Sequence, residues 1–260
     1  MLRKGTRVLN NEIRSEPGDV RVGKVSFRVA NLTSAADTII RIAHDASPTP
    51  IRLANAYCVA LASKRPEYES LMAGPGINYP DGTPVAWFMR RTNRAARTVR
   101  GPSVFCEVLS MSRMGSLRHY FVGTNDETLA SLTAEIERRY PGVAIAGFHA
   151  PEYGPVTEAG LSTITARIRA AEPDIVWVAL GTPKQDFAAA KIAEELGIPC
   201  VGVGAAFDFV SGSVPEAPAW MQNRGLEWLY RLAREPRRLW RRYTVENLQF
   251  LYSVLAHSRQ

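Results

Sequence analysis

The sequence of 260 residues has few cysteines and no long apolar run. Its three cysteines, Cys58, Cys106 and Cys200, are far apart in apolar surroundings, which indicates neither a disulfide framework nor a zinc motif. No stretch approaches the roughly 18 apolar residues that cross a bilayer. The charged N-terminal segment also lacks the apolar core of a signal peptide. These absences predict a cytoplasmic protein whose contact with a membrane is peripheral.

The motifs of several large enzyme classes are missing as well. The four histidines are scattered and no Asp-x-Asp occurs, so we expect neither a metal site nor a cofactor. Gly202 and Gly204 begin a dinucleotide fingerprint, but Phe207 stands where its third glycine belongs. Neither a P-loop nor a Gly-x-Ser-x-Gly elbow is found. A P-loop NTPase is therefore excluded, and an oxidoreductase or a serine hydrolase is disfavoured.

Short β-branched runs alternate with longer helical patterns along most of the chain. The strand candidates are Val25–Val29, Ile51–Ala54, His119–Gly123, Val143–Gly147, Ile175–Leu180 and Cys200–Gly204. The helical candidates are Asn55–Ser63, Asp126–Tyr140, Leu161–Ala171 and Lys184–Leu196. Strands separated by helices are typical of βαβ units. We therefore predict an α/β fold, a Rossmann-like, mainly parallel sheet with flanking helices, plus a C-terminal helical appendage.

The composition divides the chain into three segments. Residues 1–20 are polar and include Pro17 and Gly18, which predicts a weakly ordered lead-in. Residues 21–214 hold the alternating pattern and form the predicted body. Residues 215–260 are rich in arginine and tryptophan and show no further strand pattern. They form the predicted appendage.

The appendage contains the most unusual stretch, Trp220–Tyr243. It contains seven arginines and only two glutamates, so this stretch has a formal charge of +5 out of the chain's +7. Arginine suits phosphate because its planar fork donates two parallel hydrogen bonds. Leucines and aromatic residues recur at helical spacing among the arginines, and Pro236 is expected to begin a second helix. The pattern fits either a solvated basic face on a packed helix or a surface for an apolar, phosphate-bearing partner.

Glycine-rich loops follow three of the predicted strands. Gly123 follows the strand at His119, Gly181 and Thr182 follow the strand at Ile175, and Gly204 follows the strand at Cys200. Ligands of parallel sheets bind at the carboxyl ends of the strands, where backbone N–H groups can approach a phosphate. The glycines are therefore candidate substrate-binding residues, or else simple turn residues.

Asp81 is the acid with the most informative surroundings. Pro80 and Gly82 impose a turn on it between apolar flanks. Partial desolvation there would raise the pKa of the carboxyl toward that of a working general base. The alternative is an aspartate that caps the helix expected to begin near Thr83.

Four other polar residues lie at the predicted strand ends. Asn55 opens a helix, so N-capping is its expected role. Asp208 lies between two phenylalanines, and Lys184 and Gln185 begin a helix where they face either solvent or a ligand.

Taken in order, six strings resemble the WecG/TagA/CpsF family of bacterial glycosyltransferases. They are NAYCVALA, PDGTPVAWFMRR, ALGTPKQDF, GVGAAFDFVSG, APAW and LEWLYRLAREPRRLWRRY, which together span roughly Ile51 to Tyr243. The resemblance implies an inverting, metal-independent transfer of a sugar from a UDP-sugar to an undecaprenyl-diphosphate-linked saccharide in surface polysaccharide or exopolysaccharide synthesis. The sugar is N-acetylmannosamine-type or another hexose or uronic acid. The resemblance further implies a helical appendage that completes the site at an anionic membrane surface.

Site roles follow from the same resemblance. The family's proposed base falls on Asp81, and its polar pocket residues fall on Asn55, Gln185 and Asp208. Its appendage arginines fall on Arg231, Arg238 and Arg241.

Four departures from the family pattern concern the donor and acceptor pockets. Leu53 replaces a threonine, Ser103 an aspartate, a residue near Ala188 a tryptophan, and Glu216 an arginine. They bear on which sugar is used more than on the reaction type.

The main alternative function is a basic nucleotide- or nucleic-acid-binding protein without transferase activity. A net charge of +7 and a pI near 9.5 permit it, but no nucleic-acid-binding motif is present, so we expect no nucleic-acid partner. A homo-oligomer is compatible with the sequence, which does not determine it.

Overall fold

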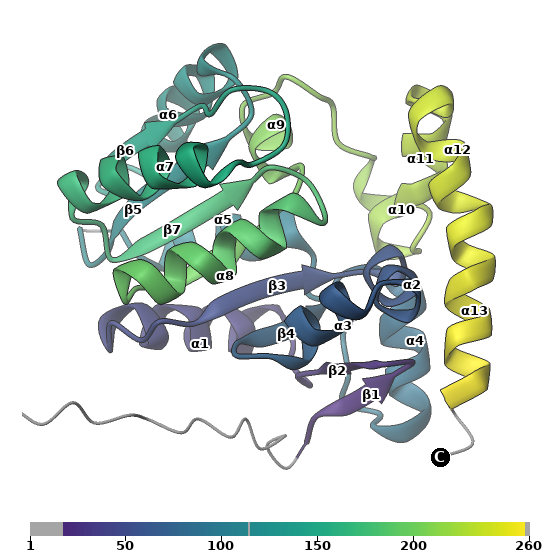
Figure 1. Cartoon of the computed structure of the whole chain (residues 1–260). Coiled ribbons are helices and arrows are strands. Elements are labelled where there is room, and N and C mark those ends of the chain that lie inside the picture. The colour runs from purple at the N-terminus through teal and green to yellow at the C-terminus, as the bar shows by residue number, and fades with distance from the viewer. Residues whose placement is uncertain (1–17, 114, 258–260) are drawn as a thin grey trace, which may run out of the picture.

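The computed structural model describes residues 18–113 and 115–257 (Figure 1). Its main feature is a six-stranded sheet in the order β4-β3-β8-β7-β5-β6, in which every neighbouring pair is parallel. These strands are β3 (Pro50–Ala54), β4 (Ile77–Pro80), β5 (Arg118–Gly123), β6 (Ala144–His149), β7 (Ile175–Ala179) and β8 (Cys200–Gly202). The predicted α/β, Rossmann-like class is confirmed.

Helices cover both faces of this sheet. One face packs against α1 (Leu32–His44), α5 (Gly101–Met111), α6 (Asp126–Arg139) and α9 (Ala206–Val210). The other face packs against α7 (Glu158–Ala171) and α8 (Lys184–Leu196). Strand β7 lies between these layers and is apolar without alternation, as a strand buried on both sides should be.

A second apolar cluster joins the remaining elements beside the sheet. It contains residues from β1 (Val20–Val22), β2 (Val25–Phe27), α2 (Ala56–Lys64), α3 (Pro66–Ala73), α4 (Thr83–Thr92) and α13 (Val245–His257). Strands β1 and β2 form a separate antiparallel pair. The predicted strand Val25–Val29 is therefore a strand, but outside the main sheet. Of the predicted lead-in, residues 1–17 lie outside the described residues, and Val20 already belongs to β1.

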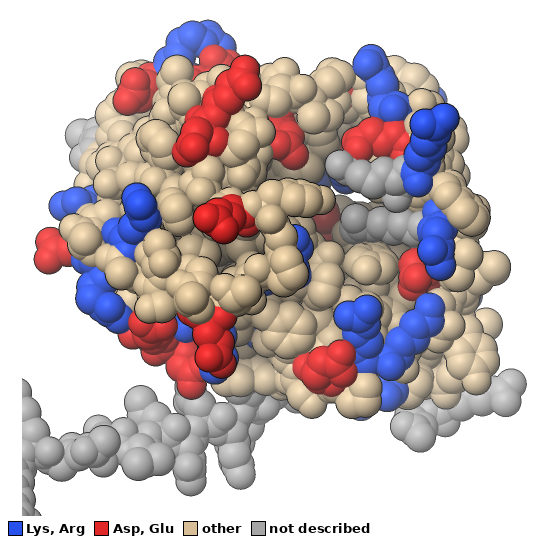
Figure 2. All heavy atoms as spheres, turned by 45° about the horizontal axis from the view of Figure 1, so that its top comes forward, with Lys and Arg blue, Asp and Glu red and all other residues tan. Residues whose placement is uncertain are grey.

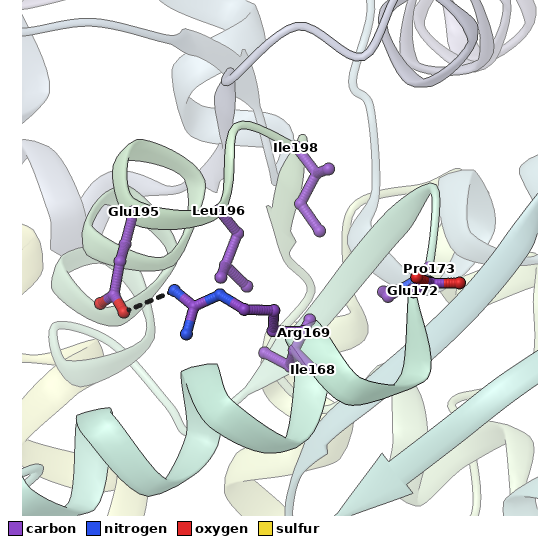
Figure 3. Close-up of a pocket in the computed structure, with 7 residues that line it drawn as sticks. All are labelled: Ile168, Arg169, Glu172, Pro173, Glu195, Leu196 and Ile198. Atoms are coloured by element: carbon purple, nitrogen blue, oxygen red, sulfur yellow. Dashed lines mark hydrogen bonds and ion pairs between the residues drawn. The ribbon is translucent and has the colours of Figure 1, made fainter.

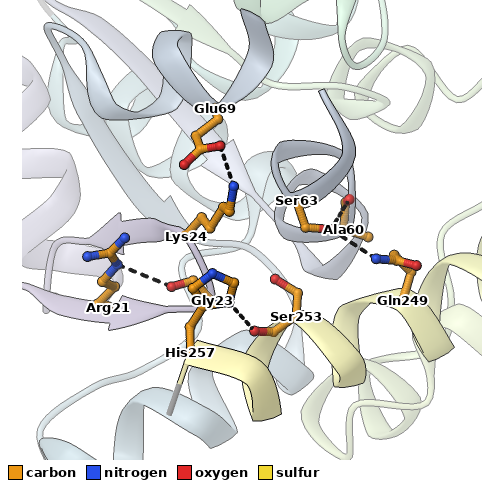
Figure 4. A network of polar contacts seen from close by, with 9 residues as sticks. All are labelled: Arg21, Gly23, Lys24, Ala60, Ser63, Glu69, Gln249, Ser253 and His257. Atoms are coloured by element: carbon orange, nitrogen blue, oxygen red, sulfur yellow. Dashed lines mark hydrogen bonds and ion pairs between the residues drawn. The ribbon is translucent and has the colours of Figure 1, made fainter. Parts of the chain in front are cut away.

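The C-terminal helices form the expected appendage beside the body. They are α10 (Ala219–Asn223), α11 (Glu227–Arg234), α12 (Pro236–Tyr243) and α13. Pro236 stands at the start of α12, as predicted. Helix α13 runs along α2, where Gln249 donates a hydrogen bond to Ser63 at 3.2 Å (Figure 4). The turn between β1 and β2 touches the same helix, because a Cβ on Gly23 would lie 2.7 Å from Oγ of Ser253.

Two buried polar clusters lie within the body. On β5, His119 accepts a hydrogen bond from the Trp177 indole at 3.0 Å and lies 2.8 Å from the Ser112 hydroxyl, and burial lowers the pKa of His119 to about 4. At the start of α8, the Tyr68 hydroxyl donates to the buried carboxylate of Asp186 at 2.7 Å. Burial raises the pKa of Asp186 to about 6, although the Tyr68 hydrogen bond and the charge of Arg52 act in the opposite direction.

His119 and Asp186 have opposite effects on how the unfolding free energy changes with pH, and the two effects largely cancel in wild type. Neutral His119 stabilises the fold above pH 6.5, and this contribution is lost as the pH falls toward 4. Protonated Asp186 stabilises the fold below pH 3.8, and this contribution is lost as the pH rises through about 6. We expect Asp186→Asn to lose about 2–3 kcal/mol of unfolding free energy relative to wild type between pH 6 and 4, at 1.36 kcal/mol per pKa unit.

Denaturant titrations at several pH values measure this difference. The matched control is Asp37→Asn, the same substitution at an exposed position of α1, which should follow wild type. Parallel stability curves for Asp186→Asn and wild type would contradict the assignment.

Candidate functional site

The carboxyl ends of the parallel strands point toward the appendage (Figure 1). The loops after β3, β4, β5, β7 and β8 therefore open on the side where α10 and α11 lie. At or directly after these strand ends lie the predicted base, Asp81, and the predicted substrate-binding residues Asn55, Gly82, Gly123, Gly181, Thr182 and Gly204.

Asp81 lies half-buried in the turn between β4 and α4, and its N–H donates to the Ala54 carbonyl at 2.9 Å. The N-cap of α4 is Gly82, which has a φ of 91° and gives the helix no side-chain cap. Asp81 therefore lies one residue before the N-cap position of α4. A Cβ on Gly82 would lie 3.9 Å from the Asn55 side chain, so the two strand-end loops are in contact.

Asn55 has the capping role expected from its position. Its side-chain oxygen accepts the Tyr57 N–H at 3.0 Å at the N-terminus of α2. This contact fixes the amide of Asn55 beside the turn of Asp81.

Gly123 is required by the fold. Its φ is 136°, and a Cβ there would lie 2.4 Å from the Ala179 carbonyl oxygen at the end of β7. The next residue, Thr124, donates from its hydroxyl to Asp208 at 3.5 Å. The close approach of β5 and β7 thus places the loop after β5 against α9.

The loop after β7 connects three parts of the carboxyl edge. Gly181 has positive φ with open space around it, and Thr182 contributes a hydrogen bond to Asp186. Gln185 is buried, and its side-chain oxygen accepts the Gly204 N–H at 3.2 Å. Lys184 extends away to the loop after β6, where its ammonium donates to the Gly154 carbonyl at 2.8 Å. Both side chains therefore hold neighbouring loops in place.

Arg100, at the N-cap of α5, is a site residue that the sequence reasoning missed. Its guanidinium makes a two-pronged contact with Glu227 of α11 at 2.7 and 2.9 Å. It also lies 3.5 Å from Glu216 and over the Phe209 ring at 5.6 Å. Burial lowers the pKa of Arg100, but Glu227, Glu216 and Asp81 together raise it by more, so the group stays charged. Arg100 thus ties the appendage to the body beside Asp81.

The predicted appendage arginines have different surroundings. Half-buried Arg231 has its guanidinium 5.6 Å from the centre of the Phe209 ring, the same ring that Arg100 covers. Arg241 is exposed, and the side chain of Arg238 lies outside the described residues. Of the two whose side chains are described, Arg231 is the one that lies against α9, the helix after β8.

The rest of the appendage presents basic and apolar groups to the surface, and Figure 2 shows lysine and arginine side chains along it. Arg224, Arg234 and Arg237 are exposed. Helix α11 buries no residue, and Leu229, which the helical pattern places on the side opposite the arginines, is 45% exposed. The interpretation of α11 as a core-packed helix is wrong for the described residues.

Two hollows differ in their relation to this edge. One, of about 180 Å³, lies where α7 and α8 end, with the Arg169–Glu195 ion pair at its side (Figure 3). The chain enters β7 and β8 there, so it lies at the amino end of the sheet. The other, of about 380 Å³, lies between α4, α11 and α13, next to the turn of Asp81. The second is the one that adjoins the candidate site.

Within residues 18–113 and 115–257, no three His, Cys, Asp or Glu side chains are grouped to hold a metal ion. None of the described helices is both long and apolar enough to cross a membrane.

Comparison with known proteins identifies the family. The model of the glycosyl transferase WecG/TagA/CpsF family matches residues 20–260. The chain belongs to this family. It is therefore a glycosyltransferase, as the resemblance predicted, and the match includes both the body and the appendage.

Two curated relatives have the same name, N-acetylglucosaminyldiphosphoundecaprenol N-acetyl-beta-D-mannosaminyltransferase. The protein of Bacillus subtilis strain 168 is 31% identical over 224 residues, 85% of each chain. That of Bacillus spizizenii strain W23 is 30% identical over 200 residues, 76% of this glycosyltransferase and 75% of the relative. A solved structure of an arylmalonate decarboxylase mutant matches 73% of this chain and 79% of its own at 12% identity, with a TM-score of 0.26, too low to bear on fold or function.

Proposed function

We propose that the enzyme transfers a sugar from a UDP-sugar to a saccharide linked to a polyprenyl diphosphate. The observation that supports this most is that Arg100 interacts electrostatically with Asp81 and lies over the same Phe209 ring as Arg231 of the appendage. Such a transfer uses an acid as base and a cation for the leaving diphosphate, and Asp81 and Arg231 are the candidates, while Arg100 is paired with Glu227. The names of both relatives specify a diphosphoundecaprenol-linked acceptor and an N-acetylmannosaminyl donor group.

In this mechanism Asp81 is the general base. The acceptor hydroxyl gives its proton to the Asp81 carboxylate while its oxygen bonds to the anomeric carbon of the donor sugar. The bond from that carbon to the UDP oxygen breaks, and UDP leaves with the electron pair. A single displacement of this kind inverts the anomeric configuration.

The leaving diphosphate needs stabilisation by donors already in place. Arg231 and the backbone N–H groups of the loop after β7 are our candidates, in place of a metal ion. The Gly204 N–H is already paired with Gln185. Gly204 would therefore act by keeping its loop close to α8, and the N–H groups near Gly181 would meet the phosphate.

The proposed location is the inner face of the cytoplasmic membrane, with the appendage as the contact. Exposed apolar side chains lie close to the exposed arginines: Trp220 is 55% exposed, Trp240 51% and Leu248 69%. Each basic residue near an anionic surface contributes roughly 1 kcal/mol, enough for reversible docking.

A transfer assay tests the proposed reaction. Purified enzyme is incubated with each of a panel of UDP-sugars and a GlcNAc-diphosphate-prenol acceptor, and the product linkage is determined by NMR. We expect one UDP-sugar to be used, with inverted configuration and activity retained in EDTA. Product of retained configuration, or no transfer from any UDP-sugar, would contradict the proposal.

A binding measurement separates this proposal from the alternative functions. A ligand that binds only the folded state raises the unfolding free energy, by about 2.7 kcal/mol at 100 times its Kd. We expect UDP to raise the melting temperature, and NAD and a short oligonucleotide to leave it unchanged. Protection by the oligonucleotide alone would instead favour a nucleic-acid-binding protein.

A further inference from the structure

The hollow between α4, α11 and α13 is an apolar pocket of about 380 Å³. Hereafter it is called the α4–α13 pocket. Its lining residues are Thr83, Pro84, Trp87, Phe88, Gly225, Trp228, Asn247, Phe250 and Leu251. None of them is charged, and the polar ones are a threonine and an asparagine. Its volume is within the range of about 300–1,000 Å³ typical of small-molecule sites.

Aromatic side chains form the walls of the pocket. The Trp87 and Phe88 rings meet edge to face at 4.7 Å, and Phe88 meets Phe250 at 5.5 Å. The Arg91 guanidinium lies over the Trp87 ring, 4.5 Å from its centre. Trp87 and Trp228 are 48% and 41% exposed. These are large apolar groups left accessible, which commonly marks a binding surface.

The pocket shares a wall with the proposed site. Thr83, which lines it, follows Asp81 by two residues, and a Cβ on Gly225 would lie 2.3 Å from the Thr83 hydroxyl. Trp228, on the other wall, directly follows Glu227, which holds Arg100. A molecule whose polar head lies at Asp81 would therefore have the apolar surface of this pocket beside it.

We propose that the α4–α13 pocket binds the first isoprenyl units of the acceptor lipid, those next to its diphosphate. This inference depends on the proposed function and adds a specific lipid subsite to it. The pocket is too small for a whole polyprenyl chain. The remainder of the chain would leave along the exposed apolar stripe of α13, where Leu248, Tyr252 and Leu255 are 69%, 69% and 62% exposed and Leu251 joins stripe and pocket.

Titration calorimetry on the whole wild-type protein gives the first test. The ligands are inorganic diphosphate, isopentenyl diphosphate with one isoprenyl unit, and farnesyl diphosphate with three. We expect affinity to rise at least tenfold from one unit to three, with a more negative heat-capacity change, because burying apolar surface produces that signature. Equal affinity for all three would overturn the proposal.

A pair of variants locates the binding. Leu251→Trp fills the pocket, while Leu255→Trp makes the same change on the same stripe of α13 at a residue that does not line it. We expect Leu251→Trp to abolish the gain from isoprenyl units and Leu255→Trp to keep it. If Leu251→Trp fails to fold, the calorimetric comparison of the three diphosphates on the wild-type protein still tests the proposal. Displacement of farnesyl diphosphate by lysophosphatidylglycerol at equal concentration would show a general membrane-lipid site and overturn the proposal.

The transfer reaction distinguishes failure of the subsite from failure of the function. Acceptors with the same GlcNAc-diphosphate head and increasing prenyl length should show a falling KM at constant kcat. If KM and kcat did not change with prenyl length, the lipid subsite would be contradicted and the proposed function would still hold. Prenyl-dependent binding without any transfer would support the subsite and count against the proposed function.

Discussion

Asp81→Asn is expected to lower kcat by about 10²–10⁴, the usual contribution of a positioned general base. The substitution keeps the size of the side chain and removes its ability to take a proton from the acceptor hydroxyl. Arg231, the side chain proposed to meet the leaving diphosphate, is left unchanged. KM values for donor and acceptor should therefore change little.

Three measurements separate a chemical role from a structural one. UDP should protect Asp81→Asn against thermal unfolding as well as it protects wild type. The acidic limb of the wild-type profile of kcat against pH should be absent from the residual activity of the variant. The turnover of Asp37→Asn, which makes the same substitution at an exposed residue of α1, should equal that of wild type. Asp81→Asn that kept more than about a tenth of the wild-type kcat would exclude the base role.

The turn around Asp81 shows what the sequence determines and what it leaves open. Pro80, Gly82 and Pro84 impose a turn followed by a helix, and both are present. The short strand before the turn was not predicted. Ile77–Pro80 has four residues, one of them a proline, and its strand character comes from pairing with β3 at the edge of the sheet. Pairing of this kind depends on long-range contacts that local propensity does not contain.

Long periodic segments were predicted best. Helix α8 begins and ends at the predicted residues, and β7 differs by one residue. A regular helical period indicates a helix, and a short uninterrupted apolar run between turn residues indicates a buried strand. Helix α1 was missed although Asn31 and Ser34 form a capping box at its start. That signal was present in the sequence.

The site itself depends on pairings that a single sequence cannot show. Arg100 and Glu227 are 127 positions apart, and their contact helps to hold α11 on the body. The helical period of α11 separated arginines from leucines, but it did not indicate which side meets the body. In the structure Arg231 faces Phe209 and Leu229 faces solvent. A family match predicts residue roles here, and the geometry then distinguishes Arg231 from the arginines that stay at the surface.

Arg231→Ala is expected to lower kcat/KM by about 10²–10³, the effect of losing one donor that stabilises developing charge, or about 2.7–4 kcal/mol. Arg231 is half-buried over Phe209, between the appendage and α9. A guanidinium held there meets a diphosphate in a setting where little water screens the interaction. Arg231→Lys should recover only part of the loss, because lysine keeps the charge but not the two-pronged geometry.

Arg234→Ala provides the matched control on the same helix. Arg234 is exposed and stacks on Tyr230 at 5.3 Å, away from Phe209. With a water-soluble short-prenyl acceptor, Arg234→Ala should stay within about threefold of wild type, as an exposed side chain outside the site would. On anionic liposomes it should bind several-fold more weakly, given roughly 1 kcal/mol per basic residue.

The contrast between these variants assigns the appendage arginines to chemistry or to docking. Arg231→Ala should keep its activity defect with the soluble acceptor and sediment with anionic liposomes as wild type does. If its defect disappeared with the soluble acceptor, Arg231 would belong to the docking surface, and the leaving diphosphate would need another cation. Among the described side chains, Arg100 would then be the other arginine over Phe209, and it could serve only by releasing Glu227.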